Sequence, residues 1–238
     1  MHTNLSAHHH HLFCSYRQVR AAGRRREWLE SIVLVTLTAF GGHLLAQTLL
    51  REPPDLITCD TYLPLILASW YLVNHSPFNA IPALLAMPVV HQLAVVLMES
   101  HRAAVLCAVV TAAAGSLRAA GSAPNAPALP FFGPIIAGAV SACGGLFFPP
   151  DRGLRSLREG VPWPLQSALY AATFYHLAVH EQGPLGRFLR HYVLGAAVDA
   201  AAARAAVAAL FSICGALQTA FGPSFNALAP LHAAVYAL

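Results

Sequence analysis

The feature that most constrains the fold is a long apolar stretch, Leu29 to Leu50, with the sequence LESIVLVTLTAFGGHLLAQTLL. In a helix, these 22 residues reach about 33 Å, and the hydrocarbon core of a bilayer is about 30 Å thick. The stretch therefore predicts a transmembrane helix. Two adjacent glycines, Gly41 and Gly42, lie at its middle and predict a weak point there.

A second apolar stretch repeats this design about a hundred residues later. Phe131 to Phe148 reads FFGPIIAGAVSACGGLFF and contains Gly144 and Gly145. Glycine in a bilayer helix lets neighbouring backbones approach closely, so small-residue packing is one interpretation. The other is a break that exposes carbonyls to a water-filled pore, as in discontinuous helices of channels and transporters. Two occurrences favour the break, and we expect the two glycine pairs to face one another across a pore.

The composition indicates a membrane protein. Of the 238 residues, 57% are hydrophobic and 10% are charged, whereas about 25% of the residues in an average soluble domain are charged. The charges avoid the apolar runs, so the chain lacks the polar outer stripes that a soluble helical bundle needs. We predict a polar, basic tail over residues 1–27 and one transmembrane domain over residues 28–238.

Prolines and polar turns divide the apolar part of the chain into about six spans, which predicts an all-α membrane protein with a polytopic helical bundle. The spans expected after the first are Tyr62 to Val73, Ala80 to Met98, Phe131 to Phe148, about Pro164 to Val179, and about Phe188 to Phe221. Pro88 should kink the third of the six spans. If that helix continues to Ala114, Glu99 and Arg102 lie well inside the protein or the membrane.

The distribution of arginine predicts the orientation of the spans. The tail and the 151–160 loop hold eight arginines, against four in the loops expected on the opposite side. The first set is Arg17, Arg20, Arg24, Arg25, Arg26, Arg152, Arg155 and Arg158, and the second is Arg51, Arg118, Arg187 and Arg190. By the positive-inside rule, both termini are predicted to be cytosolic.

Ionisable residues within the spans are candidate functional residues, because they are costly at membrane depth. Glu99 and Arg102, at positions i and i+3, either neutralise one another or leave Arg102 to face an anionic lipid headgroup or the ion path. Asp199 and Arg204 lie five residues apart, which is poor spacing for a pair on one helix. We predict them to be intramembrane charges that pair with other helices.

Three polar residues close to the first glycine pair are candidates for lining a pore, namely Thr38, His43 and Gln47. No enzyme or metal site is indicated, because His, Asp and Glu do not cluster at metal-ligand spacing and no GxSxG or P-loop motif occurs. The five cysteines are dispersed without a CxxC pair. We therefore expect no catalytic residue, no metal, no resident cofactor and no nucleic-acid partner.

Several short motifs follow one another from about Glu27 to Leu228. They are Phe40-Gly41-Gly42, Leu50-Arg51-Glu52-Pro53, Leu67-Ala68-Ser69-Trp70-Tyr71-Leu72, Ser76-Pro77-Phe78-Asn79, Pro88-Val89, Glu99 with Arg102, the later glycine helix, Ser167-Ala168-Leu169-Tyr170, and Ser224-Phe225-Asn226-Ala227-Leu228. In order and spacing this set resembles the trimeric intracellular cation (TRIC) channel family.

The resemblance implies a homotrimer in which each subunit has its own pore. That pore would be built from two inverted three-helix repeats plus a seventh helix, with the two glycine helices lining it. The resemblance also implies a potassium-preferring channel for monovalent cations in the endoplasmic or sarcoplasmic reticulum or the nuclear membrane. There K⁺ flow would balance charge during calcium release, and membrane lipids would surround the protein.

The sequence departs from the family pattern in two places. Family members bind phosphoinositide through a Lys-Glu-x-x-Arg motif, and here Met98 replaces the lysine before Glu99 and Arg102. We therefore expect phosphoinositide binding to be weakened. The family's first transmembrane helix also has no full counterpart, because only Leu12 to Tyr16 resembles its end, so six spans are expected instead of seven.

Two other classes of function stay open from the sequence. A secondary transporter also uses glycine-broken helices and inverted repeats, and a non-conducting structural membrane protein would need neither. Replacing Arg102 with alanine is expected to change gating or trimer yield more than the fold.

Overall fold

The computed structural model describes residues 27–120, 131–147, 163–195, 198–222, 225–230 and 233. Within these ranges the regular elements are all helices, which confirms the predicted all-α fold. The tail over residues 1–26 and the basic segment with Arg152, Arg155 and Arg158 lie outside the described residues. The orientation predicted from the arginines therefore stays a prediction.

The first predicted span is helix α2 (Trp28–Leu50), which is one uninterrupted α-helix of 23 residues. It ends at Arg51, whose backbone is left-handed at φ 57°, and the N–H of Arg51 donates to the carbonyl oxygens of Gln47 and Thr48. Pro53 follows and has no N–H with which to continue the helix. The prolyl end of the first span was predicted correctly.

The next elements form a short helical return along α2. Helix α3 (Asp55–Thr58) is a single turn, and α4 (Tyr62–His75) packs against α2 through a small apolar cluster. The buried members of this cluster are Val35, Phe40, Leu65, Ile66 and Val73. A 3-10 turn, η1 (Pro77–Asn79), then leads into the short helix α5 (Ala80–Ala86).

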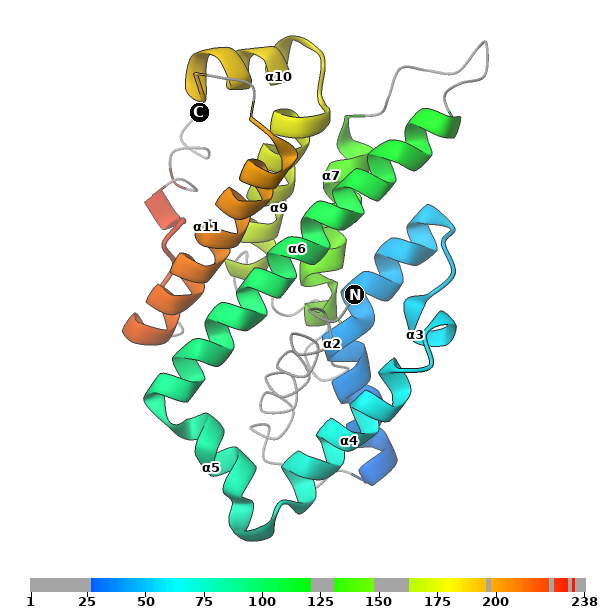
Figure 1. Cartoon of the computed structure of the whole chain (residues 1–238), viewed down its shortest axis with the longest axis vertical. Coiled ribbons are helices and arrows are strands. Elements are labelled where there is room, and N and C mark those ends of the chain that lie inside the picture. The colour runs from blue at the N-terminus through cyan, green and yellow to red at the C-terminus, as the bar shows by residue number, and fades with distance from the viewer. Residues whose placement is uncertain are drawn as a thin grey trace.

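Helix α6 (Pro88–Ala120) is the central element of the molecule and has 33 residues. At 1.5 Å per residue it is about 50 Å long. Because α5 ends at Ala86 and α6 begins at Pro88, the break predicted at this proline is confirmed. The helix continues through Glu99 and Arg102, so this pair lies within it and far from either end. In Figure 1, α6 runs diagonally between α2 and α4 on one side and α9 and α11 on the other.

The second glycine-containing span is divided between two helix types. Helix α7 (Phe132–Cys143) is α-helical, and η2 (Gly144–Phe147) continues it as a 3-10 turn. Helix α9 (Trp163–Tyr175) likewise passes into a π-helical turn, η3 (His176–His180). Both changes of helix type alter the spacing of the residues that backbone hydrogen bonds join, from i+4 to i+3 in η2 and to i+5 in η3.

The last predicted span, Phe188 to Phe221, is wrong as a single helix. The chain forms α10 (Pro184–Phe188), a π-helical turn η4 (Leu189–Val193), and then α11 (Ala200–Phe221). Gly195 has a left-handed φ of 70°, and Asp199 is extended at φ −61° and ψ 146°. Neither conformation continues an α-helix.

The main core lies where α6 packs against α7, α9 and α11. Its fully buried side chains include Leu106 and Val110 on α6, Tyr175 on α9 and Phe211 on α11. Alanines fill much of the remaining core, and their small side chains let the helix backbones approach closely.

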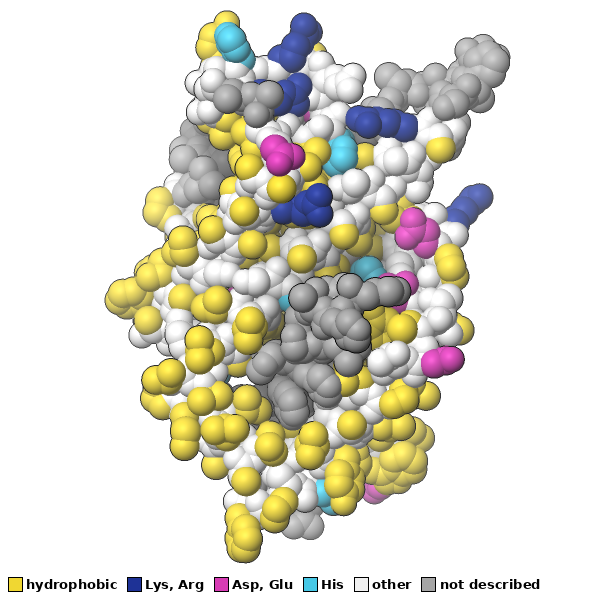
Figure 2. All heavy atoms as spheres, viewed as in Figure 1, with side chains coloured by type: hydrophobic (Ala, Val, Ile, Leu, Met, Phe, Trp, Pro, Cys, Tyr) yellow, Lys and Arg dark blue, Asp and Glu magenta, His cyan; other side chains and the backbone are white. Residues whose placement is uncertain are grey.

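The outer surface is strongly apolar. Helices α2, α6 and α11 are long and apolar enough to cross a membrane, by length and composition, whereas α7 is a shorter apolar helix. Exposed apolar side chains cover much of the lower part of the face in Figure 2, and Arg side chains gather mainly toward the top. A continuous exposed apolar surface of this kind is typical of contact with lipid or with other subunits.

Candidate functional site

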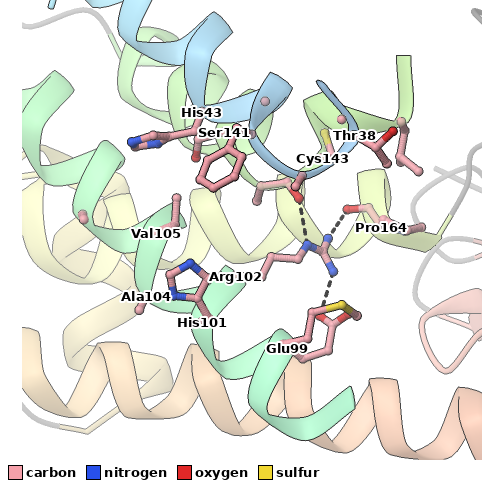
Figure 3. A pocket seen from close by; sticks show the side chains of 18 of the residues that line it. Thr38, His43, Glu99, His101, Arg102, Ala104, Val105, Ser141, Cys143 and Pro164 are labelled. Atoms are coloured by element: carbon pink, nitrogen blue, oxygen red, sulfur yellow. Dashed lines mark hydrogen bonds and ion pairs between the residues drawn. The ribbon is translucent and has the colours of Figure 1, made fainter. Parts of the chain in front are cut away.

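A cavity of about 450 Å³ opens between α2, α6 and the α7–η2 segment. Helix α3, the start of α4 and the start of α9 also contribute to its wall. The lining includes Thr38, Gly42, His43, Asp55, Tyr62, Met98, Glu99, His101, Arg102, Ser141 and Gly145. It therefore brings together residues from both glycine-containing segments and the Glu99/Arg102 pair (Figure 3).

The helix break predicted at Gly41 and Gly42 is wrong. Both glycines are buried inside the continuous helix α2, which packs against α7 and η2. Glycine costs about 1 kcal/mol relative to alanine in a helix, and the flanking leucines and alanines of α2 are good helix formers. At Gly41 and Gly42 the structure therefore agrees with the alternative interpretation, in which glycine allows close packing of helices.

At the second pair the helix type does change, because α7 ends at Cys143 and Gly144 begins the 3-10 turn η2. Gly145 lies directly against the backbone of α2, where an added Cβ would overlap the carbonyl oxygen of Thr38. Gly42 and Gly145 both line the cavity. The two glycine segments therefore meet at one cavity, although only the second departs from the α-helix.

The polar residues predicted to line a pore separate into two groups. Thr38 and His43 line the cavity, whereas Gln47 is absent from its wall. Gln47 is buried, and its Oε1 accepts a hydrogen bond of 3.2 Å from the N–H of Asp55. Its backbone carbonyl also accepts from the N–H of Glu52, at 2.9 Å. Gln47 thus fixes the connection between α2 and α3.

Glu99 and Arg102 form the ion pair that their spacing predicts. Arg102 Nη1 donates to Glu99 Oε2 over 2.8 Å, and the two side chains are only 6% and 8% exposed. Breaking such a pair leaves a buried charge without compensation, which is much more costly than losing a surface pair.

The rest of the Arg102 guanidinium binds to three further helices. Nε donates to the carbonyl oxygen of Ala142 over 2.9 Å, in the last turn of α7, where carbonyls lack a partner within the α-helix. Nη2 donates to Ser167 Oγ over 2.9 Å and also to the carbonyl oxygen of Pro164, both on α9. The guanidinium carbon lies 4.5 Å from the ring centroid of Phe211 on α11. Arg102 therefore joins α6, α7, α9 and α11.

Glu99 and Arg102, which hold two positions of the family's phosphoinositide motif, are both buried. A lipid phosphate would need the guanidinium of Arg102, which is buried and already donates hydrogen bonds from all three of its nitrogens within the chain. Met98, at the position of the family lysine, lines the cavity but carries no charge.

Asp199 and Arg204 do not belong to the cavity. Asp199 precedes the first residue of α11 and is exposed, so it does not lie inside a helix as the single span over Phe188 to Phe221 predicted. Arg204 lies in the second turn of α11, is exposed, and its Nε donates to the carbonyl oxygen of Ala200 on the same helix over 3.4 Å.

Four polar residues of the cavity wall were not predicted from the sequence, namely Asp55, Tyr62, His101 and Ser141. His43 Nε2 and Asp55 Oδ2 lie 2.9 Å apart. Asp55 follows two prolines in a connection, so no helical periodicity ties it to the cavity. In the part of the chain that the structure describes, no three His, Cys, Asp or Glu side chains are grouped so as to hold a metal ion.

The model of the TRIC channel family matches residues 24–123. That family consists of channels and not of enzymes. No curated protein sequence matches the chain at a significant level.

Solved structures match nearly the whole chain. A trimeric intracellular cation channel from C. elegans with bound Ca²⁺ has a TM-score of 0.63 at 19% identity, covering 91% of this chain and 90% of that chain. The same type of channel from C. elegans without Ca²⁺ has a TM-score of 0.63 at 17% identity, with coverages of 94% and 92%. A structure described as "Structural basis for activity of TRIC counter-ion channels in calcium release" has a TM-score of 0.65 at 17% identity, with coverages of 90% and 92%.

At these identities the structural matches establish the fold. The match to the family model over residues 24–123 and the structural matches over at least 90% of the chain confirm the resemblance to the TRIC channel family, and the chain has the TRIC channel fold.

Proposed function

We propose that the chain is the subunit of a channel for monovalent cations, with a preference for potassium. The observation that carries this proposal is the cavity, lined in part by polar side chains, where the two glycine segments meet inside an apolar bundle. Two of the similar structures are described as a trimeric intracellular cation channel and as TRIC counter-ion channels in calcium release. We propose the same counter-ion role here.

Two hydroxyl groups in the cavity wall favour a cation over an anion. Thr38 donates its hydroxyl proton to the carbonyl oxygen of Leu34, and Ser141 donates to that of Gly138, each over 2.7 Å. With their protons engaged inside the helices, both oxygens have lone pairs left to accept. Oxygen lone pairs can replace part of the hydration shell of a monovalent cation.

We base the proposed oligomeric state and membrane location of the protein on its resemblance to the TRIC channel family. We propose a homotrimer with one pore per subunit, built from inverted repeats, in the endoplasmic or sarcoplasmic reticulum or the nuclear membrane, with both termini in the cytosol. The exposed apolar side chains of α2, α4 and α11 would contact lipid or neighbouring subunits.

Purified protein fused into planar bilayers should give ohmic, potassium-selective unitary currents, and mass measurement in detergent should give a trimer.

Thr38→Val should lower the unitary conductance, because it removes a lining oxygen. Thr36→Val is the matched control, since Thr36 makes the same bond to its own helix, at 2.8 Å to the carbonyl oxygen of Ile32, but is absent from the cavity wall.

Well-folded trimers without current would contradict the channel. Saturable, substrate-coupled uptake in place of ohmic current would identify a secondary transporter instead, and neither current nor uptake would identify a structural membrane protein.

We further propose that the channel works without phosphoinositide, because the guanidinium of Arg102 is occupied by the chain's own acceptors. Binding to vesicles that contain a phosphoinositide should equal binding to vesicles with the same charge from phosphatidylserine, and the current should be the same in both lipids. A selective gain in binding or in open probability with phosphoinositide would overturn this proposal.

A further inference from the structure

Three residues with formal charge at neutral pH line the described wall of the cavity, namely Asp55, Glu99 and Arg102. Glu99 and Arg102 compensate one another across 2.8 Å. Among the described residues of the wall, Asp55 is therefore the carboxylate that no arginine compensates. Its side chain is 48% exposed, so ions in solvent can contact the carboxylate.

Two contacts, one to the carboxylate and one to the backbone N–H, hold Asp55 beside α2. His43 Nε2 lies 2.9 Å from Asp55 Oδ2, and the N–H of Asp55 donates to Gln47 Oε1 over 3.2 Å. His43 Nδ1 is buried and has no hydrogen-bond partner among the described residues. Nε2 is therefore the nitrogen through which the His43 ring contacts the chain, and that contact is with the Asp55 carboxylate.

The other titratable groups around the cavity do not replace this charge. Tyr62 on α4 and His101 on α6 line the same wall, and neither side chain carries a carboxylate. In Figure 3 the ring of His43 and the Glu99/Arg102 pair lie at different parts of the cavity. The neutralised pair and the uncompensated carboxylate are thus separate features of the wall.

We propose that Asp55 is the residue that concentrates cations in the cavity and makes it select against anions, with His43 holding the carboxylate in place. This inference rests on the proposed channel function and assigns its charge selection to one side chain. In water, a single charge about 4 Å from an ion changes the local ion concentration about fivefold. The effect falls in high salt, because the Debye length decreases from about 10 Å at 0.1 M to about 3 Å at 1 M.

The test measures unitary conductance and reversal potential in KCl gradients at low and high salt. Asp55→Asn removes the charge but keeps the shape and an oxygen that accepts a bond from His43. We expect conductance to fall about fivefold in dilute KCl, to stay close to that of the unchanged protein at 1 M, and the reversal potential to move toward zero. Asp55→Glu, which keeps the charge, should retain most of the conductance.

Asp60→Asn is the matched control, because Asp60 is exposed in the same connection but is absent from the cavity wall. Equal effects of Asp55→Asn and Asp60→Asn, or no effect of either, would overturn the assignment to Asp55 while the channel itself stands. An unchanged protein that carries no current would overturn the channel and this inference together. Loss of trimers in Asp55→Asn but not in Asp55→Glu would show that the carboxylate is needed for the fold, which also contradicts the proposal.

Discussion

Replacing Arg102 with alanine is expected to lower the free energy of unfolding by about 3–5 kcal/mol. The substitution leaves the carboxylate of Glu99 buried without its partner. It also removes the donors to the carbonyl oxygens of Ala142 and Pro164 and to the hydroxyl of Ser167. Chemical denaturation of the purified protein in detergent micelles measures this loss.

Arg204→Ala is the control for this experiment. It removes the same side chain from an exposed position of α11, where the guanidinium makes one long bond within its own helix. We expect a change within about 0.5 kcal/mol, as for other surface substitutions. The double substitution Glu99→Leu with Arg102→Met should recover much of the loss, because it removes both charges together. Similar losses in the two single alanine variants would contradict the internal role of Arg102.

This expectation differs from the one that followed from the sequence, which placed the effect of Arg102→Ala mainly on gating or trimer yield. The two expectations differ because the side chain of Arg102 is buried in the structure. From the sequence, the guanidinium could face lipid or the ion path, whereas in the structure it joins four helices of one subunit. A fold defect is therefore the first consequence, and lower current follows from it.

The second large effect is expected for Gly145→Ala. The new methyl group would overlap the carbonyl oxygen of Thr38, which is backbone and has no rotamer with which to avoid it. Overpacking of this kind costs about 1–3 kcal/mol, and moving η2 away from α2 also changes the cavity wall. We expect both the unfolding midpoint in denaturant and the unitary conductance to fall.

Gly115→Ala is the matched control with the opposite sign. Gly115 lies within α6, and an added Cβ would meet no atom within 4 Å. Alanine is more favourable than glycine in a helix by about 1 kcal/mol, so the midpoint should rise while the conductance stays unchanged. If the two substitutions shift the midpoint in the same direction, close approach is not the reason for the glycine at position 145.

The contrast between the two glycine pairs shows which parts of the site the sequence predicts. A glycine pair in the sequence shows that two side chains are absent. It does not show whether a neighbouring backbone fills the space or the helix breaks. At Gly41 and Gly42 the helix continues, and at Gly144 it changes to a 3-10 turn. Both behaviours came from the same sequence pattern, so only packing distinguishes them.

Local spacing and long-range contact also differ in how well they were predicted. The pairing of Glu99 with Arg102 follows from their i and i+3 positions on one helix, and the break at Pro88 follows from the missing N–H. The bonds from Arg102 to Ala142 and Ser167 join residues 40 and 65 positions apart. Asp55 reaches the cavity through a connection that follows two prolines, and no periodic pattern places such a residue. The site was therefore predicted where it depends on one helix and missed where it depends on how helices meet.

The unequal state of the two glycine segments has a mechanical consequence for the cavity. Helix α2 keeps its hydrogen bonds along all 23 residues and forms a stiff wall. On the opposite wall, η2 is a 3-10 turn of four residues, and such turns have weaker hydrogen-bond geometry than an α-helix. We therefore expect any change in the width of the cavity to come from rotation of η2 against α2. In that case α2 stays in place, and the segment with the second glycine pair moves.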